Sequence, residues 1–148
     1  MASAEHEVLV ARDAMTVYAF LLDGRNLPSW LTDVRSAGLT SGSAGGVGSK
    51  YQVTMDGPRG RPVARDYEVT HARPGAEIQF RVVAGPSLLH GGFYLSTEGP
   101  GTRVRFALEA PMRGFRSLIR PAYRGRLRAA VAQLSRLPRV IEERTTAG

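Results

Sequence analysis

A chain of 148 residues is long enough to bury a substantial core without disulfides or a structural metal. The absence of cysteine excludes a disulfide framework, a thiolate metal site and a cysteine nucleophile, and no apolar run approaches the roughly 20 residues that span a bilayer. The formal net charge of +7 is confined to the end of the chain, since residues 1–111 carry 11 basic and 11 acidic side chains and residues 112–148 carry nine arginines and two glutamates.

The N-terminal part is predicted to form one strand and two short helices. Loose alternation of apolar residues predicts a strand over residues 5–12. Asp13 is a plausible N-cap for a helix over Ala14–Leu22. A second helical turn is expected around residues 26–31, where a proline fits the first turn and Trp30 is the only tryptophan.

The middle of the chain alternates with a period of two residues. A glycine-rich stretch, 38–48, lacks the lysine and the spacing of a P-loop and is interpreted as a flexible connection between strands. Alternating segments follow it, separated by turn signals: 51–56, 63–70, 78–82, 89–97 and 103–109, with turns at 57–62, 71–75, 85–86 and 99–101. Such consecutive strands predict an antiparallel meander with one apolar face.

The longest helical pattern runs from Met112 to about Glu143. Pro121 is expected to kink or divide this helix, because proline lacks the amide donor and clashes with the preceding turn. Apolar residues recur at steps of three and four: Phe115, Leu118, Ile119, Tyr123, Leu127, Ala130, Val131, Leu134, Leu137 and Ile141. Another face carries arginines at steps of four: Arg116, Arg120, Arg124 and Arg128. The arginine face indicates either a solvated surface in a protein rich in arginine or contact with an anionic partner.

These elements combine into a single α+β domain over residues 1–148. The sheet and the long helix each have an apolar face, so we expect a curved antiparallel sheet of about seven strands wrapped around the C-terminal helix, with two short helices after the first strand. The first residues show neither the basic region nor the apolar segment of a signal peptide, and we expect a cytoplasmic protein.

This order of elements resembles the helix-grip fold of the START/Bet v 1-like (SRPBCC) superfamily, and most of all its polyketide cyclase/dehydrase and lipid-transport group. The resemblance covers nearly the whole chain and rests on the Pro-x-Trp of Ala14–Val34, the Gly-x-Gly-x-x-aromatic of Gly45–Val53, the Gly-Thr-Arg-Val hairpin of Ser96–Glu109, and the final helix with its proline near Leu118–Tyr123. It implies a cavity between the sheet and the C-terminal helix that takes a hydrophobic ligand. Members include lipid and sterol carriers, hormone and coenzyme-Q binders, and aromatase/cyclases, and the fold alone does not choose among them.

Strand alternation predicts which side chains face that cavity. Arg65 shares the parity of the inward residues, where a guanidinium could bind a carboxylate, phosphate or enolate oxygen with Tyr51 and Tyr67 as hydrogen-bond donors. Alternatively, Arg65 reaches solvent or pairs with a nearby acid. The resemblance places Trp30 and Leu27 at the cavity mouth, although a core role for Trp30 is the commoner one. The remaining predicted ligand contacts are Met55, Phe80, Phe93, Phe106, Phe115, Ile119 and Tyr123.

The three histidines are candidates for a metal site or a catalytic base. None has a metal-ligand spacing such as His-x-x-x-His, so we expect neither metal nor cofactor. His90 is placed on the outer face by alternation, unless a bulge at Gly91 and Gly92 redirects it; a catalytic role is its weaker interpretation. No nucleophile-elbow pattern supports a hydrolase triad.

Two functions compete at this point. In the first, the cavity only binds or carries a lipid- or polyketide-like molecule; in the second, Arg65, Tyr51 and Tyr67 polarise a carbonyl in a cyclase/aromatase-like reaction without metal. A third hypothesis is electrostatic docking of the arginine-rich helix on an anionic membrane or RNA. Monomer and dimer both stay open.

Overall fold

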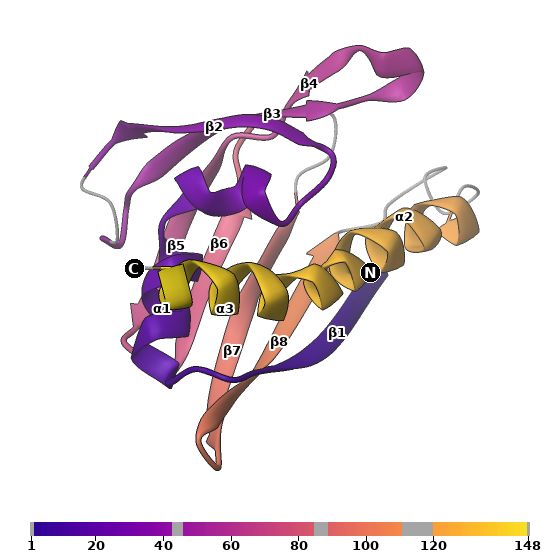
Figure 1. The fold of residues 1–148 in the computed structure, drawn as a ribbon. Helices are drawn as coiled ribbons and strands as arrows, with labels where there is room; N and C mark the ends of the chain where they lie inside the picture. Colours follow the sequence, from indigo (N-terminus) through magenta and orange to yellow (C-terminus); the bar gives the residue numbers. More distant parts are fainter. Residues whose placement is uncertain (1, 43–45, 85–88, 111–119, 148) are drawn as a thin grey trace.

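One curved antiparallel sheet and one long helix dominate the fold (Figure 1). The computed structural model describes residues 2–42, 46–84, 89–110 and 120–147. Its strands are β1 (Ala2–Val10), β2 (Val34–Ser41), β3 (Lys50–Asp56), β4 (Pro62–Ala64), β5 (Tyr67–Arg73), β6 (Glu77–Val82), β7 (His90–Glu98) and β8 (Gly101–Ala110). Its helical segments are α1 (Ala14–Leu22), η1 (Gly24–Ser29), η2 (Pro58–Gly60), α2 (Arg120–Ala132), η4 (Gln133–Arg136) and α3 (Leu137–Ala147).

The strand order is β1-β8-β7-β6-β5-β3-β2, with the short β4 paired to β3. The run from β5 to β8 is the predicted meander. β1 closes the sheet beside β8 in a continuous register from Ala2 opposite Ala110 to Val10 opposite Thr102. The predicted α+β architecture, a curled antiparallel sheet with a long C-terminal helix against it, is confirmed.

The first helix begins where the sequence predicts. Asp13 has an extended backbone, and its carboxylate accepts hydrogen bonds from Thr16 N (3.2 Å) and Thr16 Oγ1 (2.6 Å). These hydrogen bonds lower the pKa of Asp13. One residue after the helix, Asp23 accepts from Arg25 N (3.0 Å) and so starts η1 directly.

The C-terminal helix packs its apolar stripe toward the sheet. Leu127, Val131, Leu134, Leu137 and Ile141 are each at most 4% exposed, as the predicted periodicity requires. In Figure 1 the helix crosses one face of the sheet, over β7, β8 and β1. Its contacts are mainly with β1 and β8. Burial of each such side chain contributes about 1.5–3 kcal/mol, so this stripe is a main source of stability.

Within the described residues the helix is interrupted near Pro138, and the residues before Pro121, which would show the expected kink there, lie outside the described part. Pro121 is in the first described turn of α2, whereas the regular helix gives way to the tighter turn η4 just before Pro138. Because Pro138 has no amide to donate to Leu134 O, the amide of Leu137 makes this bond instead, three residues along. Phe115, Arg116, Leu118 and Ile119 lie outside the described residues.

Strand boundaries also differ from the predicted ones. β1 is Ala2–Val10, whereas the sequence predicts a strand over 5–12. β2 runs to Ser41, into the stretch interpreted as a flexible connection. The strand predicted over 63–70 is broken between β4 and β5, where Asp66 Oδ1 accepts from Val53 N (3.1 Å) in place of a backbone carbonyl. β5 then continues to Arg73 with a bulge at Thr70, so His71 is in a strand and not in a turn.

Candidate functional site

The inner face of the sheet carries a continuous aromatic cluster. Trp30 is 1% exposed and meets Phe93 and Phe106 edge-on, with ring centroids 6.0 and 5.9 Å away. Phe93 and Phe106 stack on each other at 4.6 Å. Phe80 lies 6.0 Å from Phe93 and 5.5 Å from Tyr67, which extends the cluster toward β5. The structure therefore brings together aromatic residues from β5, β6, β7 and β8, as predicted from strand parity, and adds Trp30 from the end of η1.

Two tyrosines continue the cluster toward the first helices. Tyr51 and Tyr67 stack at 5.2 Å, and the Tyr51 hydroxyl donates to Leu22 O over 3.4 Å. The Tyr67 hydroxyl lies against Gly24, where an added Cβ would be only 2.1 Å from it. Burial, followed by the charges of Tyr51 and Asp23, raises the pKa of Tyr67 well above the ordinary range. Tyr67 thus stays a neutral hydrogen-bond donor at physiological pH.

Only some side chains on this inner face are accessible to solvent. Trp30 and Tyr51 are fully buried, whereas Tyr67, Phe80, Met55 and Leu27 are partly buried against the same core. Arg65 lies at the break between β4 and β5, its amide donates to Val53 O (2.8 Å), and its Nη1 atom is buried. The side chains of Arg120, Tyr123 and Arg124 lie outside the part that the structure describes.

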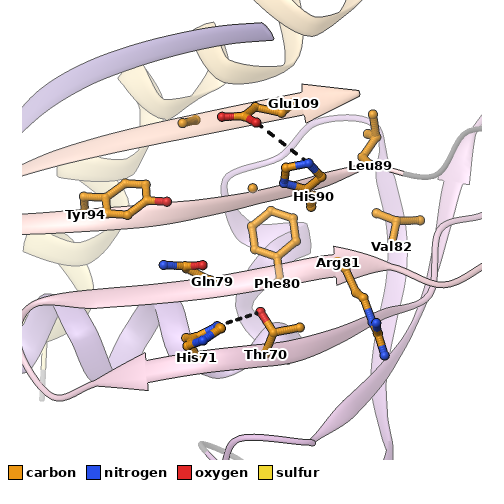
Figure 2. Close-up of a pocket in the computed structure, with 12 residues that line it drawn as sticks. Thr70, His71, Gln79, Phe80, Arg81, Val82, Leu89, His90, Tyr94 and Glu109 are labelled. Atoms are coloured by element: carbon orange, nitrogen blue, oxygen red, sulfur yellow. Dashed lines mark hydrogen bonds and ion pairs between the residues drawn. The ribbon is translucent and has the colours of Figure 1, made fainter. Parts of the chain in front are cut away.

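A second feature, absent from the sequence-based prediction, is a hollow of about 490 Å³ on the opposite face of the sheet (Figure 2). Its apolar lining comes from Phe80, Val82, Leu89, Gly91 and Ala107. Its polar lining is Thr70, His71, Gln79, Arg81, His90, Tyr94 and Glu109, several of which alternate with the core residues of β6, β7 and β8. The signal that could have found it is the glycine pair of β7 beside Ala107 of β8, which removes side chains from the middle of the sheet.

The histidines are separate from the aromatic cluster. His90 pairs with Glu109 in an unshifted register, so the conjectured bulge is absent from β7 and His90 stays on the outer face, as simple alternation predicts. Its Nε2 is 3.8 Å from a Glu109 oxygen. His71 Nδ1 is 3.4 Å from Thr70 Oγ1, and His6 Nε2 is 2.9 Å from Ser135 Oγ.

The arginines of the sheet and those of the C-terminal helix differ in their ion-pair partners and in their exposure. Sheet arginines are paired with carboxylates, as in Arg81 with Glu68 (2.8 Å) and Arg103 with Glu98 (2.6 Å). On the C-terminal helix, Arg128 of the predicted stripe is exposed, as are Arg126, Arg136, Arg139 and Arg144.

Among the described residues, no three His, Asp or Glu side chains are grouped so that they could hold a metal ion. None of the helices in the described ranges combines the length and the hydropathy needed to span a bilayer.

Comparison with known proteins identifies the family. The family model for polyketide cyclase / dehydrase and lipid transport matches residues 1–139. No functionally curated protein matches the chain.

Solved structures share the fold at low sequence identity. A crystal structure of a protein from Thermus thermophilus has a TM-score of 0.77 at 22% identity, covering 98% of this chain and 97% of that one. A START superfamily protein from Mycobacterium smegmatis has a TM-score of 0.71 at 18% identity, covering 97% of both chains. Major latex-like protein 151 from Panax ginseng has a TM-score of 0.60 at 16% identity, covering 93% of this chain and 98% of that one. With its START-like helix-grip fold, the chain belongs to the polyketide cyclase / dehydrase and lipid transport family.

Proposed function

We propose that this protein binds a hydrophobic small molecule, lipid- or polyketide-like, in an internal cavity between the sheet and the C-terminal helix. The observation that carries the proposal is the partly buried edge of the aromatic cluster, formed by Tyr67, Phe80, Met55 and Leu27. Apolar side chains left partly accessible on the inner face of a sheet are a surface that a hydrophobic ligand can cover, at about 25 cal/mol per Å² removed from water. Tyr67 and Arg65 would orient a polar end of that ligand.

Native mass spectrometry of freshly purified protein tests this proposal through a co-purifying ligand. Added ligands can be followed by the fluorescence of Trp30, whose ring contacts Phe93 and Phe106. Met55→Gln keeps the side-chain length but removes an apolar contact, and we expect about tenfold weaker binding, which corresponds to roughly 1.4 kcal/mol.

The matched control for this experiment is Met15→Gln, because Met15 is 53% exposed on α1. It should leave affinity unchanged. Equal affinities for the two variants, or no hydrophobic ligand bound by the wild type from any lipid or polyketide fraction, would contradict an internal site.

The enzymatic alternative is a cyclase/aromatase-like reaction in the same cavity. The partly buried Tyr67 favours it, because burial raises the pKa of its hydroxyl and a neutral donor shielded from water can stabilise a developing enolate oxygen. Tyr67→Phe should then lower turnover of a poly-β-keto thioester far more than it lowers affinity for it. An equal fall in both would assign Tyr67 to ligand binding alone.

Electrostatic docking through the helix is the second candidate, and the distribution of ion pairs favours it. Within the described residues, Arg126, Arg128 and Arg136 have no carboxylate within ion-pair distance, and Arg139 meets Glu143 only at 3.9 Å. Arginines free of internal partners are available to lipid phosphates or to an RNA backbone.

Co-sedimentation with phosphatidylglycerol vesicles tests this docking. The triple variant Arg126→Gln, Arg128→Gln, Arg136→Gln should lose binding. A matched triple variant in the sheet (Arg73→Gln, Arg81→Gln, Arg103→Gln) has the same net charge and should retain it. Equal losses would reduce the effect to overall charge.

A further inference from the structure

The outer-face hollow is assembled by the strand register. Gln79 of β6 is opposite Gly92 of β7, which is opposite Ala107 of β8. In the next outward-facing row, Arg81, His90 and Glu109 lie side by side. Small residues in the middle of one row, beside long polar side chains in the other, leave the depression that Figure 2 shows between β6 and β8.

The glycines and Tyr94 fix its shape. A Cβ at Gly91 would lie 2.3 Å from Ala107 O, and a Cβ at Gly92 would lie 2.8 Å from Ile78 O and 3.0 Å from the Tyr94 hydroxyl. Tyr94 therefore lies over Gly92 and forms one wall of the hollow. Arg105 stacks on the Tyr94 ring at 4.4 Å and forms an ion pair with Glu5 at 3.0 Å, and these contacts fix the position of the ring.

Charges around the hollow are neutralised in pairs, with one exception. Arg81 is bound by Glu68 at 2.8 Å. Glu77, two residues before Gln79 on β6, accepts from Gln79 Nε2 (3.1 Å) and is also bound by Arg73. Glu109 instead faces His90 at 3.8 Å, and this partner is charged only when protonated. At neutral pH the hollow thus presents one carboxylate without a permanent cation.

The other polar groups in the lining can accept hydrogen bonds. Gln79 Nε2 donates one of its two N–H groups to Glu77, and the Gln79 carbonyl oxygen can accept from a ligand. The Tyr94 hydroxyl offers a lone pair, as does the imidazole of His71 or His90 whenever that ring is neutral. Gly91 and Ala107 supply a small apolar surface beside them. This combination fits a ligand with a charged donor at one end and an apolar body.

The position of the hollow also suits a cation. The whole net charge of +7 arises from residues 112–148, whereas residues 1–111 sum to zero. The described part of that basic segment, α2 to α3, packs on the inner face of the sheet, and in Figure 2 the helices lie behind the strands that carry the hollow. The sheet therefore stands between α2–α3 and the hollow.

We propose that the outer-face hollow is a second binding site, which takes a small organic cation: a protonated amine carried on an aromatic or other compact apolar body. The ammonium group binds Glu109 and the acceptors around it, and the apolar body covers Gly91 and Ala107. The site is independent of the proposed internal cavity, and its failure would leave that proposal untouched.

Titration with tyramine, followed by the amide shifts of Gly91 and Ala107 in ¹H–¹⁵N spectra, tests the site. Wild-type protein should bind tyramine at least about tenfold more tightly than 4-ethylphenol or 3-(4-hydroxyphenyl)propanoate, which share the ring and lack the cation. Glu109→Gln should weaken tyramine binding by about tenfold or more, and Ala107→Leu should abolish it by filling the hollow.

Glu98→Gln is the matched control. Glu98 lies on β7, is paired with Arg103 and does not line the hollow. This variant should bind like the wild type. Glu109 is half-exposed, so Glu109→Gln should fold even where Ala107→Leu does not. No tyramine binding by the wild type, equal binding of the neutral phenol, or unchanged binding by Glu109→Gln would each overturn the proposal.

Discussion

Gly24 packs so closely against Tyr51 and Tyr67 that adding a single methyl group there should destabilise the protein. An alanine Cβ there would lie 2.1 Å from the Tyr67 hydroxyl and 2.7 Å from the Tyr51 ring, against an ordinary contact of about 3.5 Å. Neither ring can move alone, since they stack at 5.2 Å and Tyr51 is fully buried. Gly24→Ala should therefore cost about 1–3 kcal/mol, the range for overpacked cores, which lowers Tm by about 2–4 °C per kcal/mol.

Urea denaturation of a double-mutant cycle measures this effect. Tyr67→Phe removes the hydroxyl that the new methyl group meets first, so Gly24→Ala should cost about 1 kcal/mol less in that background. The matched control is Gly38→Ala in β2, where an added Cβ has open space around it and stability should change by less than about 1 kcal/mol. Equal costs at the two glycines, or no coupling with Tyr67, would refute the reasoning.

Three further predictions concern the helices. Asp13→Ala should lower Tm at pH 7, because hydrogen bonds hold the pKa of Asp13 below its unfolded value. This contribution to stability is present above the unfolded pKa and is lost as the pH falls through the folded pKa, so the Tm values of the two proteins should converge in acid, and a constant difference would contradict the cap. Gln133→Ala should cost about 1–2 kcal/mol in urea, since its side-chain oxygen accepts from Thr32 N (2.7 Å) and Oγ1 (2.8 Å); no loss would show that these bonds are dispensable. Leu134 is fully buried, so Leu134→Ala should lower the free energy of unfolding by about 2–5 kcal/mol. Leu9 is 52% exposed, so Leu9→Ala should lower it by less than about 0.5 kcal/mol. Similar losses for the two variants would contradict the orientation of the helix.

Predictions from sequence succeeded where the signal was local. The extent of α1 follows from a cap and a run of apolar residues that are adjacent in the chain, and the stripe of the C-terminal helix follows from its periodicity. β2 was missed in part because its sequence, VRSAGLTS, has no apolar alternation. Pairing with β3, a tertiary interaction, makes it a strand.

The two candidate sites also differ in how far the sequence predicts them. Parity along single strands was enough to collect Tyr51, Tyr67, Phe80, Phe93 and Phe106 on one face, because alternation persists through each strand. The outer hollow depends on which residues of different strands become neighbours, and that register is not written in any one segment. The pairing of arginines with carboxylates across β1, β7 and β8 likewise becomes visible only in three dimensions.

The pairing of β1 with β8 has a consequence for how the chain is made. The first strand of the sheet has its hydrogen-bonding partner about a hundred residues later, and the helix that follows also packs on β1, where Ser135 meets His6 and Glu142 accepts from the amide of Ala11. A ribosome-bound chain that ends before β8 leaves β1 without its neighbour and β7 as an open edge. Closing such distant contacts is slow, so we expect the fold to form only after the last helix has left the ribosome, with the nascent strands vulnerable to aggregation until then.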